Sequence, residues 1–94
     1  MQDNDHEWDD EKASANLLKH GVSFEIATGV FKDPFALELL DDRGKYDELR
    51  LITIGMVDGV LLYVVSTERN GRLRLISARR ATRQEQDGYF TQDR

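Results

Sequence analysis

The chain has 94 residues, of which 39% are hydrophobic, one is proline and none is cysteine, and its net charge is −5. This composition fits a single domain over residues 1–94 with one modest core, and it excludes disulfides and thiolate metal sites. Because the start is polar and acidic and no apolar run reaches about 18 residues, we expect mobile residues 1–5, no secretion signal, no membrane contact and a cytoplasmic location.

The first third of the chain predicts a short strand followed by a helix. Residues 6–8 have the composition of a brief strand, and Asp9 or Asp10 can cap a helix over Glu11–Lys19. Gly21 is well placed to end this helix in the left-handed conformation.

A second helix is predicted from Ser23, which can cap it, to Asp33-Pro34, because proline disfavours helical geometry in the residue before it. Apolar side chains recur in this segment at the three- and four-residue spacing of one helix face. They are Phe24, Ala27, Val30 and Phe31.

From Phe35 onward the hydrophobic period changes to that of strands. The dipeptides Asp58-Gly59 and Asn70-Gly71 suit two-residue type I′ turns, which are strong signals for hairpins. We therefore expect an antiparallel meander. Its predicted strands are Phe35–Leu40, Leu49–Val57, Val60–Arg69 and Arg72–Arg80.

The end of the chain predicts a short helix from Ala81 to about Tyr89, in which Thr82 and Glu85 form a capping box. The predicted fold class is therefore α+β. Two N-terminal helices pack on an antiparallel β-meander of about four strands, and a short C-terminal helix follows.

The two tight turns determine which side chains share a face of the meander. Arg50 lies opposite Thr67, and Thr67 lies opposite Arg74, so three strands contribute to one polar row. The next row outward is Glu48, Arg69 and Arg72. Deeper on the same face, as a surface for the helices, we expect the rows Ile52, Val65, Ile76 and Ile54, Tyr63, Ala78.

Charge is sorted along the chain. Residues 1–48 carry 13 acidic and 5 basic side chains, a balance of −8, whereas residues 66–83 carry six arginines and one acidic residue, a balance of +5. Arg69 opposite Arg72 places like charges together, which destabilises a sheet. A phosphate would relieve this repulsion, because guanidinium donors match its oxygens.

Other interpretations of these cations stay open. Glu48 and Glu68 could instead screen the arginines on a solvated surface. Ser77 and Arg79 fall on the opposite face unless a bulge intervenes or the strand curls. By strand alternation Arg80 falls on the same face as Arg74, but it lies near the far end of its strand.

Lys19 and His20 close the first predicted helix. Cations there complement the helix dipole and bond free carbonyls, or His20 takes or gives a proton. We interpret Trp8 as a core anchor rather than a base-stacking platform. The acidic run at residues 9–11 is better explained as N-terminal helix charge than as a metal site, and no nucleotide-binding glycine loop occurs.

Two groups of residues resemble the BrnT family of toxins. The first is Glu7-Trp8-Asp9, Lys12, Asn16 and the run from Lys19 to Glu25. The second is Thr67-Glu68-Arg69, the run from Arg72 to Thr82, Glu85 and Tyr89. The resemblance covers His6 to Tyr89, and the order and spacing of the motifs together are specific.

This resemblance implies a RelE-like domain that cuts RNA and inhibits translation and growth. It also implies neutralisation by a BrnA-like antitoxin, a ribbon-helix-helix protein through which alone operator DNA would be bound. The basic residues that match the family are Lys19, His20, Arg50, Arg69, Arg74 and Arg79.

The expected chemistry is attack of a ribose 2′-hydroxyl on the adjacent phosphodiester, which needs neither metal nor cofactor. Arg50 and Arg74 would stabilise phosphoryl charge, and His20 or Lys19 would handle a proton. The expected catalytic residues are Lys19, His20, Arg50, Arg74 and Arg79, and the RNA-binding residues are Thr67, Arg69, Arg72 and Arg80. The rival interpretation is a non-catalytic binding module whose arginine face docks an acidic partner, acting only as a co-repressor.

Overall fold

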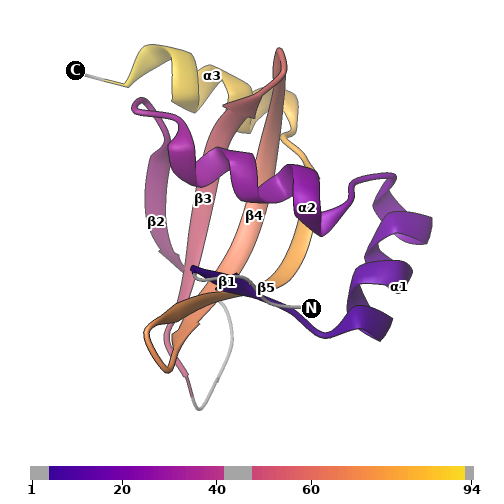
Figure 1. Ribbon diagram of the computed structural model, residues 1–94. Coiled ribbons are helices and arrows are strands. Elements are labelled where there is room, and N and C mark those ends of the chain that lie inside the picture. Colours follow the sequence, from indigo (N-terminus) through magenta and orange to yellow (C-terminus); the bar gives the residue numbers. More distant parts are fainter. Residues whose placement is uncertain (1–4, 42–47, 93–94) are drawn as a thin grey trace.

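The computed structural model describes residues 5–41 and 48–92, so the expected mobility of residues 1–5 falls, apart from Asp5, outside the described residues. Over the described ranges the chain forms an α+β fold with three α-helices, one 3₁₀ helix and five strands (Figure 1). The elements are β1 His6–Glu7, α1 Asp10–His20, α2 Phe24–Ala27, η1 Thr28–Lys32, β2 Leu37–Asp41, β3 Arg50–Val57, β4 Val60–Arg69, β5 Arg72–Arg80 and α3 Arg83–Thr91.

The predicted capping residues of helix α1 are confirmed, and the helix extends one residue further at each end than predicted. The Asp9 carboxylate accepts hydrogen bonds from two backbone N–H groups of the first turn (2.9 and 3.2 Å), and Gly21 ends the helix with φ 71°. The buried Asn16 joins α1 to β5. Its amide donates to the carbonyls of Val22 (3.0 Å) and Ala78 (2.8 Å), and its Oδ1 accepts from the Ala78 N–H (3.1 Å).

None of the helices in the described ranges is long and apolar enough to span a membrane.

The second predicted helix is interrupted. Helix α2 has only four residues, and the chain continues as the tighter 3₁₀ helix η1. This segment lies directly on β3, where a Cβ added to Gly55 would come within 2.9 Å of the Val30 Cβ and 3.0 Å of the Val30 backbone. Asp33 then accepts a hydrogen bond from the Met56 N–H of β3 (2.7 Å). Contact with the sheet therefore overrides the regular helix that the hydrophobic spacing predicts.

The sheet contains the predicted meander and one additional strand. Its order is β1-β5-β4-β3-β2, with β2 to β5 antiparallel to their neighbours. The brief strand expected near residue 6 pairs in parallel with β5, so the sheet is mixed rather than purely antiparallel. Its pairing with β5 brings the N-terminal segment to the edge of the hairpin that carries most of the arginines.

The predicted register is confirmed between β3 and β4 and is half right between β4 and β5. Asp58 and Asn70 adopt positive φ in the two turns, as type I′ hairpins require. Beyond Thr67 and Arg74 the second hairpin shifts register between Val65 and Ser66, where a β-bulge occurs.

Because of the bulge, two of the predicted cross-strand rows are wrong at their β5 residue. Val65 pairs with Ser77 and Tyr63 pairs with Arg79, rather than with Ile76 and Ala78. Because one extra residue reverses the alternation of faces, Ser77 and Arg79 lie on the same face as Arg74.

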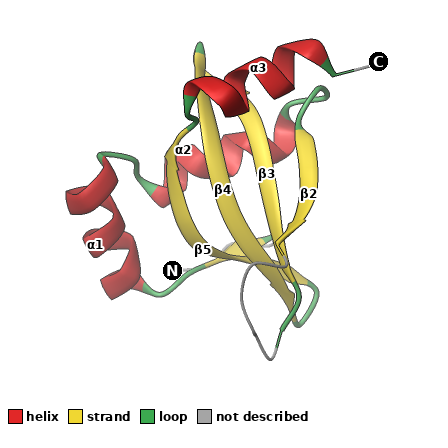
Figure 2. Cartoon of the chain, turned by 180° about the vertical axis from the view of Figure 1, so that it is seen from behind, coloured by secondary structure: helices red, strands yellow, loops and turns green. Residues whose placement is uncertain are grey.

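Different helices cover the two faces of the sheet. Figures 1 and 2 show α2 on one face and α3 on the other. The first apolar cluster is Trp8, Val22, Phe24, Ala27, Val30, Leu62, Val64, Leu75 and Ala78. The second is Ile52, Ile54, Leu61, Tyr63, Val65, Ala81 and Tyr89. The expectation that the two N-terminal helices pack on the face of the arginines is therefore wrong, because α3 covers the far half of that face.

Candidate functional site

A polar row crosses all five strands of the described sheet. The pairing aligns Asp41 of β2, Arg50 of β3, Thr67 of β4, Arg74 of β5 and Glu7 of β1. The predicted centre of this row is confirmed, since both turns are two-residue loops. We call this side of the sheet, including the next row of Arg69 opposite Arg72, the arginine face. Each edge strand contributes a carboxylate beside an arginine.

Arg74 is held by the N-terminal strand. Its Nη1 lies 2.7 Å from Oε2 of Glu7, and 26% of the Arg74 side chain and 14% of the Glu7 side chain are exposed. The parallel pairing of β1 with β5 aligns these two residues. A charge-assisted hydrogen bond of this length orients the guanidinium while part of it stays open to solvent.

Glu48 lies between arginines from two strands. Its Oε1 is 3.8 Å from an Arg50 nitrogen, and its Oε2 is 3.5 Å from an Arg69 nitrogen. Arg69 is 51% exposed and pairs with Arg72 across the turn. The like charges predicted for this hairpin end are present, and a carboxylate of the chain offsets part of their repulsion.

Thr67 stands at the centre of the row but is buried. Its hydroxyl donates to the Leu49 carbonyl (2.6 Å). The side chain therefore fixes the start of β3 against β4 and positions Arg50 beside Arg74. Direct RNA contact through Thr67 does not fit this burial.

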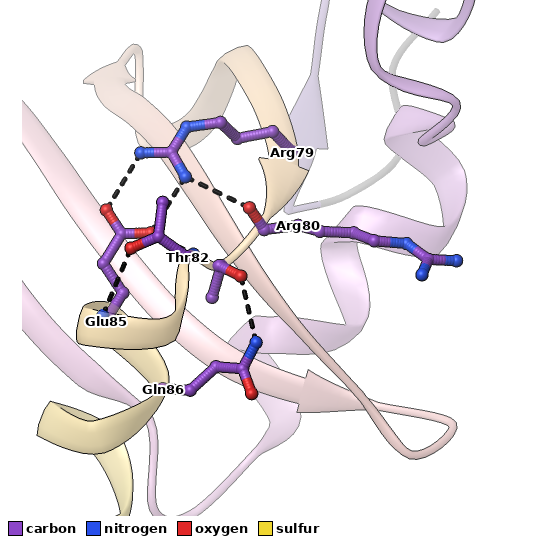
Figure 3. Close-up of polar contacts among 6 residues, drawn as sticks. Arg79, Arg80, Thr82, Glu85 and Gln86 are labelled. Atoms are coloured by element: carbon purple, nitrogen blue, oxygen red, sulfur yellow. Dashed lines mark hydrogen bonds and ion pairs between the residues drawn. The ribbon is translucent and has the colours of Figure 1, made fainter.

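Arg79 reaches the arginine face through the bulge, at the end covered by α3. Its guanidinium lies over the Tyr63 ring, 3.9 Å from the centroid, and donates to both carboxylate oxygens of Glu85 at 2.8 and 2.9 Å (Figure 3). The hydrogen bonds from Arg79 hold the pKa of Glu85 below its ordinary value of 4.5, with the Thr82 N–H acting in the same direction. Arg79 is thus engaged in fastening α3 to the sheet, on the order of 15 Å along β5 from Arg74.

Arg80 lies away from the arginine face. It pairs with Leu62, whose side chain belongs to the opposite cluster, and Figure 3 shows its side chain pointing away from Arg79. There it borders a pocket of about 220 Å³ together with Gly21 and Ser23. The bulge that brings Arg79 onto the arginine face also takes Arg80 off it.

Lys19 and His20 close α1, beyond the β5 edge of the sheet (Figures 1 and 2). Asn16 holds this helix to the Ala78 backbone, and Gly21, the next residue after His20, lines the pocket that Arg80 borders. The last turn of α1, which carries Lys19 and His20, therefore lies beside β5 and not in the polar row of Arg50 and Arg74.

The comparison with protein families shows which family the chain belongs to. A family described as "Ribonuclease toxin, BrnT, of type II toxin-antitoxin system" matches residues 8–85, which is more than half of the 94-residue chain. The chain belongs to the BrnT family. The comparison with curated proteins gives no match.

Membership of the BrnT family confirms the resemblance that the motifs carry, and it implies an RNA substrate and an antitoxin partner. The matched span begins at Trp8, an anchor of the first cluster, and ends at Glu85, which holds Arg79. The matched span contains every residue of the polar row except Glu7, which lies one residue before the span begins.

Two carboxylates of the arginine face, Glu7 and Asp41, are not among the candidate site residues that the sequence predicts. The sequence places Glu7 in a brief strand and in a family motif, and Asp41 lies one residue past the predicted end of its strand. A parallel partner for a two-residue strand has no local sequence signal, so Glu7 could not be aligned with Arg74. Extending the alternation of Leu37 and Leu39 by one step would have placed Asp41 on the arginine face.

Proposed function

We propose that the chain is a metal-independent endoribonuclease toxin with a RelE-like fold, which cleaves RNA on the arginine face. The observation that carries this proposal is the convergence of Arg50, Arg69, Arg72 and Arg74 from three neighbouring strands. This cluster is positively charged, whereas the rest of the chain is acidic. Its guanidinium groups match the oxygens of a phosphodiester. The BrnT family supplies the reaction class.

The proposed reaction is attack of the ribose 2′-hydroxyl on the adjacent phosphorus, with departure of the 5′-oxygen. Arg74 and Arg50 stabilise the charge that develops on the phosphoryl oxygens, an effect often worth about 100-fold or more per donor. Arg69 and Arg72, which flank the turn of the β4–β5 hairpin, hold a neighbouring phosphate of the RNA strand. RNA competes with Glu7 for Arg74, so binding replaces an internal ion pair with an intermolecular one.

The remaining predicted residues take supporting roles in this proposal. Arg79 holds α3 over the far end of the arginine face through Glu85. Arg80 and Lys19 provide positive charge beside β5, and His20 adds a hydrogen-bonding ring there, where a longer RNA strand leaving the site would pass.

The proposed partner is a BrnA-like ribbon-helix-helix antitoxin that covers the arginine face and alone contacts operator DNA. An acidic segment would satisfy the same guanidinium groups as RNA does, which accounts for neutralisation by competition.

Cleavage of RNA by the purified protein in excess EDTA tests the proposal. We expect specific fragments ending in a 2′,3′-cyclic phosphate, and we expect Arg74→Ala to lose both cleavage and growth inhibition. Arg83→Ala, an exposed arginine at the start of α3, serves as the matched control. Thermal melting of both variants separates lost chemistry from lost folding.

Three results would contradict the proposal. The first is RNA left intact by the parent, both as free RNA and on translating ribosomes, while an antitoxin still binds. That result would favour the binding module instead. The second is cleavage that EDTA abolishes, and the third is an Arg74→Ala variant as toxic as the parent.

A further inference from the structure

The proposed reaction needs a group that accepts the proton of the 2′-hydroxyl. Arginine stays protonated and serves poorly as a base. His20 and Lys19, the expected proton carriers, lie beyond the β5 edge rather than on the arginine face. Among the described side chains of that face, the carboxylates are Glu7, Asp41 and Glu48.

These carboxylates differ in what surrounds them. Asp41 is buried in the edge strand. Glu7 is 14% exposed and already forms a hydrogen bond of 2.7 Å with Arg74. The Glu48 side chain is 34% exposed, and its oxygens are 3.8 and 3.5 Å from its two arginine partners. Both distances exceed those of N–H···O hydrogen bonds, so the lone pairs of Glu48 are open to an incoming hydroxyl.

Glu48 also has the position that a base requires. It stands between Arg50 and Arg69, and Arg69 pairs with Arg72 across the hairpin. A phosphodiester held by these guanidinium groups brings its ribose beside the carboxylate. We propose, on the basis of the proposed ribonuclease function, that Glu48 is the general base that deprotonates the 2′-hydroxyl.

The proton and bond balance of the step is complete. The 2′-hydroxyl proton passes to Glu48 as the O2′–P bond forms, and the P–O5′ bond breaks. The leaving 5′-oxygen takes a proton from water, and the hydroxide produced takes the proton from Glu48. The products are a 2′,3′-cyclic phosphate and a 5′-hydroxyl, with no oxidant, reductant or metal consumed.

The test replaces Glu48 without changing its shape and follows cleavage and binding separately. Glu48→Gln is compared with Glu68→Gln, an exposed carboxylate on β4 whose side chain points to the opposite face by strand alternation. Cleavage of a labelled RNA is measured against pH. Binding is measured with the same RNA carrying a 2′-O-methyl group, which cannot react.

General base catalysis predicts a loss of roughly 100-fold to 10,000-fold in cleavage by Glu48→Gln. The parent's fall in rate at acid pH disappears in the variant. The charged groups that face Glu48 are Arg50 on β3 and Arg69 on β4, with Arg72 and Asp41 beyond them. Binding of the 2′-O-methyl RNA is equal or tighter, because a negative charge leaves the arginine face, and Glu68→Gln matches the parent throughout.

The outcomes separate this inference from the proposed function. A parent that cleaves no RNA overturns both. If the parent cleaves RNA and Glu48→Gln keeps either the parent's rate or its fall in rate at acid pH, only the role of Glu48 is overturned. A variant that loses cleavage only in proportion to weaker binding of the 2′-O-methyl RNA also overturns it, since Glu48 would then merely orient Arg50 and Arg69.

Discussion

Replacing Asn16 with alanine tests how α1 is attached to the sheet. The buried amide of Asn16 makes three hydrogen bonds with the backbone, two of them with Ala78 of β5. Each bond contributes about 0.5–1.5 kcal/mol net, and the unpaired backbone groups left behind add to the loss. We therefore expect Asn16→Ala to lower the free energy of unfolding by about 3 kcal/mol. For a domain of this size that corresponds to a fall in Tm on the order of 10–20 °C.

Urea denaturation followed by circular dichroism measures this change, and Leu18→Ala is the control. Leu18 lies on the same helix, but it is 91% exposed, so its truncation removes little buried surface. We expect that control to stay within about 0.5 kcal/mol of the parent. If Asn16→Ala and Leu18→Ala were equally stable, the three bonds would not be what holds α1 to β5.

The same methods test two other contacts. Replacing Glu85 with glutamine removes the ion pair with Arg79, which we expect to cost about 1 kcal/mol at neutral pH. Because the folded pKa of Glu85 lies below 4.5, this stabilisation is fully present above that pH and is lost as the pH falls through the folded value. A difference between parent and variant that did not shrink in acid would contradict the pairing. Gly55→Ala should destabilise by about 1–3 kcal/mol, because its Cβ would come within 2.9 Å of Val30. A Cβ added to Gly88 in α3 would lie 4.0 Å from Leu37 Cδ1, an ordinary van der Waals contact, so Gly88→Ala should be neutral or stabilising by up to about 1 kcal/mol. The reverse order in urea midpoints would refute the close approach at Gly55.

Local chemistry predicted much of the fold. The Asp58-Gly59 and Asn70-Gly71 turns set the pairing of three strands without reference to the rest of the chain. That pairing alone brings Arg50 beside Thr67 and Thr67 beside Arg74. The capping side chains of Asp9 and Thr82 likewise mark their helices, because each satisfies free N–H groups within the same turn.

Contacts between distant segments decided the rest. The bulge between Val65 and Ser66 moves Arg79 onto the arginine face and Arg80 off it, and no local pattern marks it. The close approach of Val30 to Gly55 replaces a regular helix with η1.

What the sequence by itself determined is the order of elements, the two hairpins and the family. Tertiary structure alone aligned Glu7 with Arg74, placed α3 over the arginine face and left His20 beyond the sheet edge. The physical reason is that hairpin pairing and capping depend on neighbouring residues. Parallel pairing and the choice of face depend on segments that meet only when the chain folds.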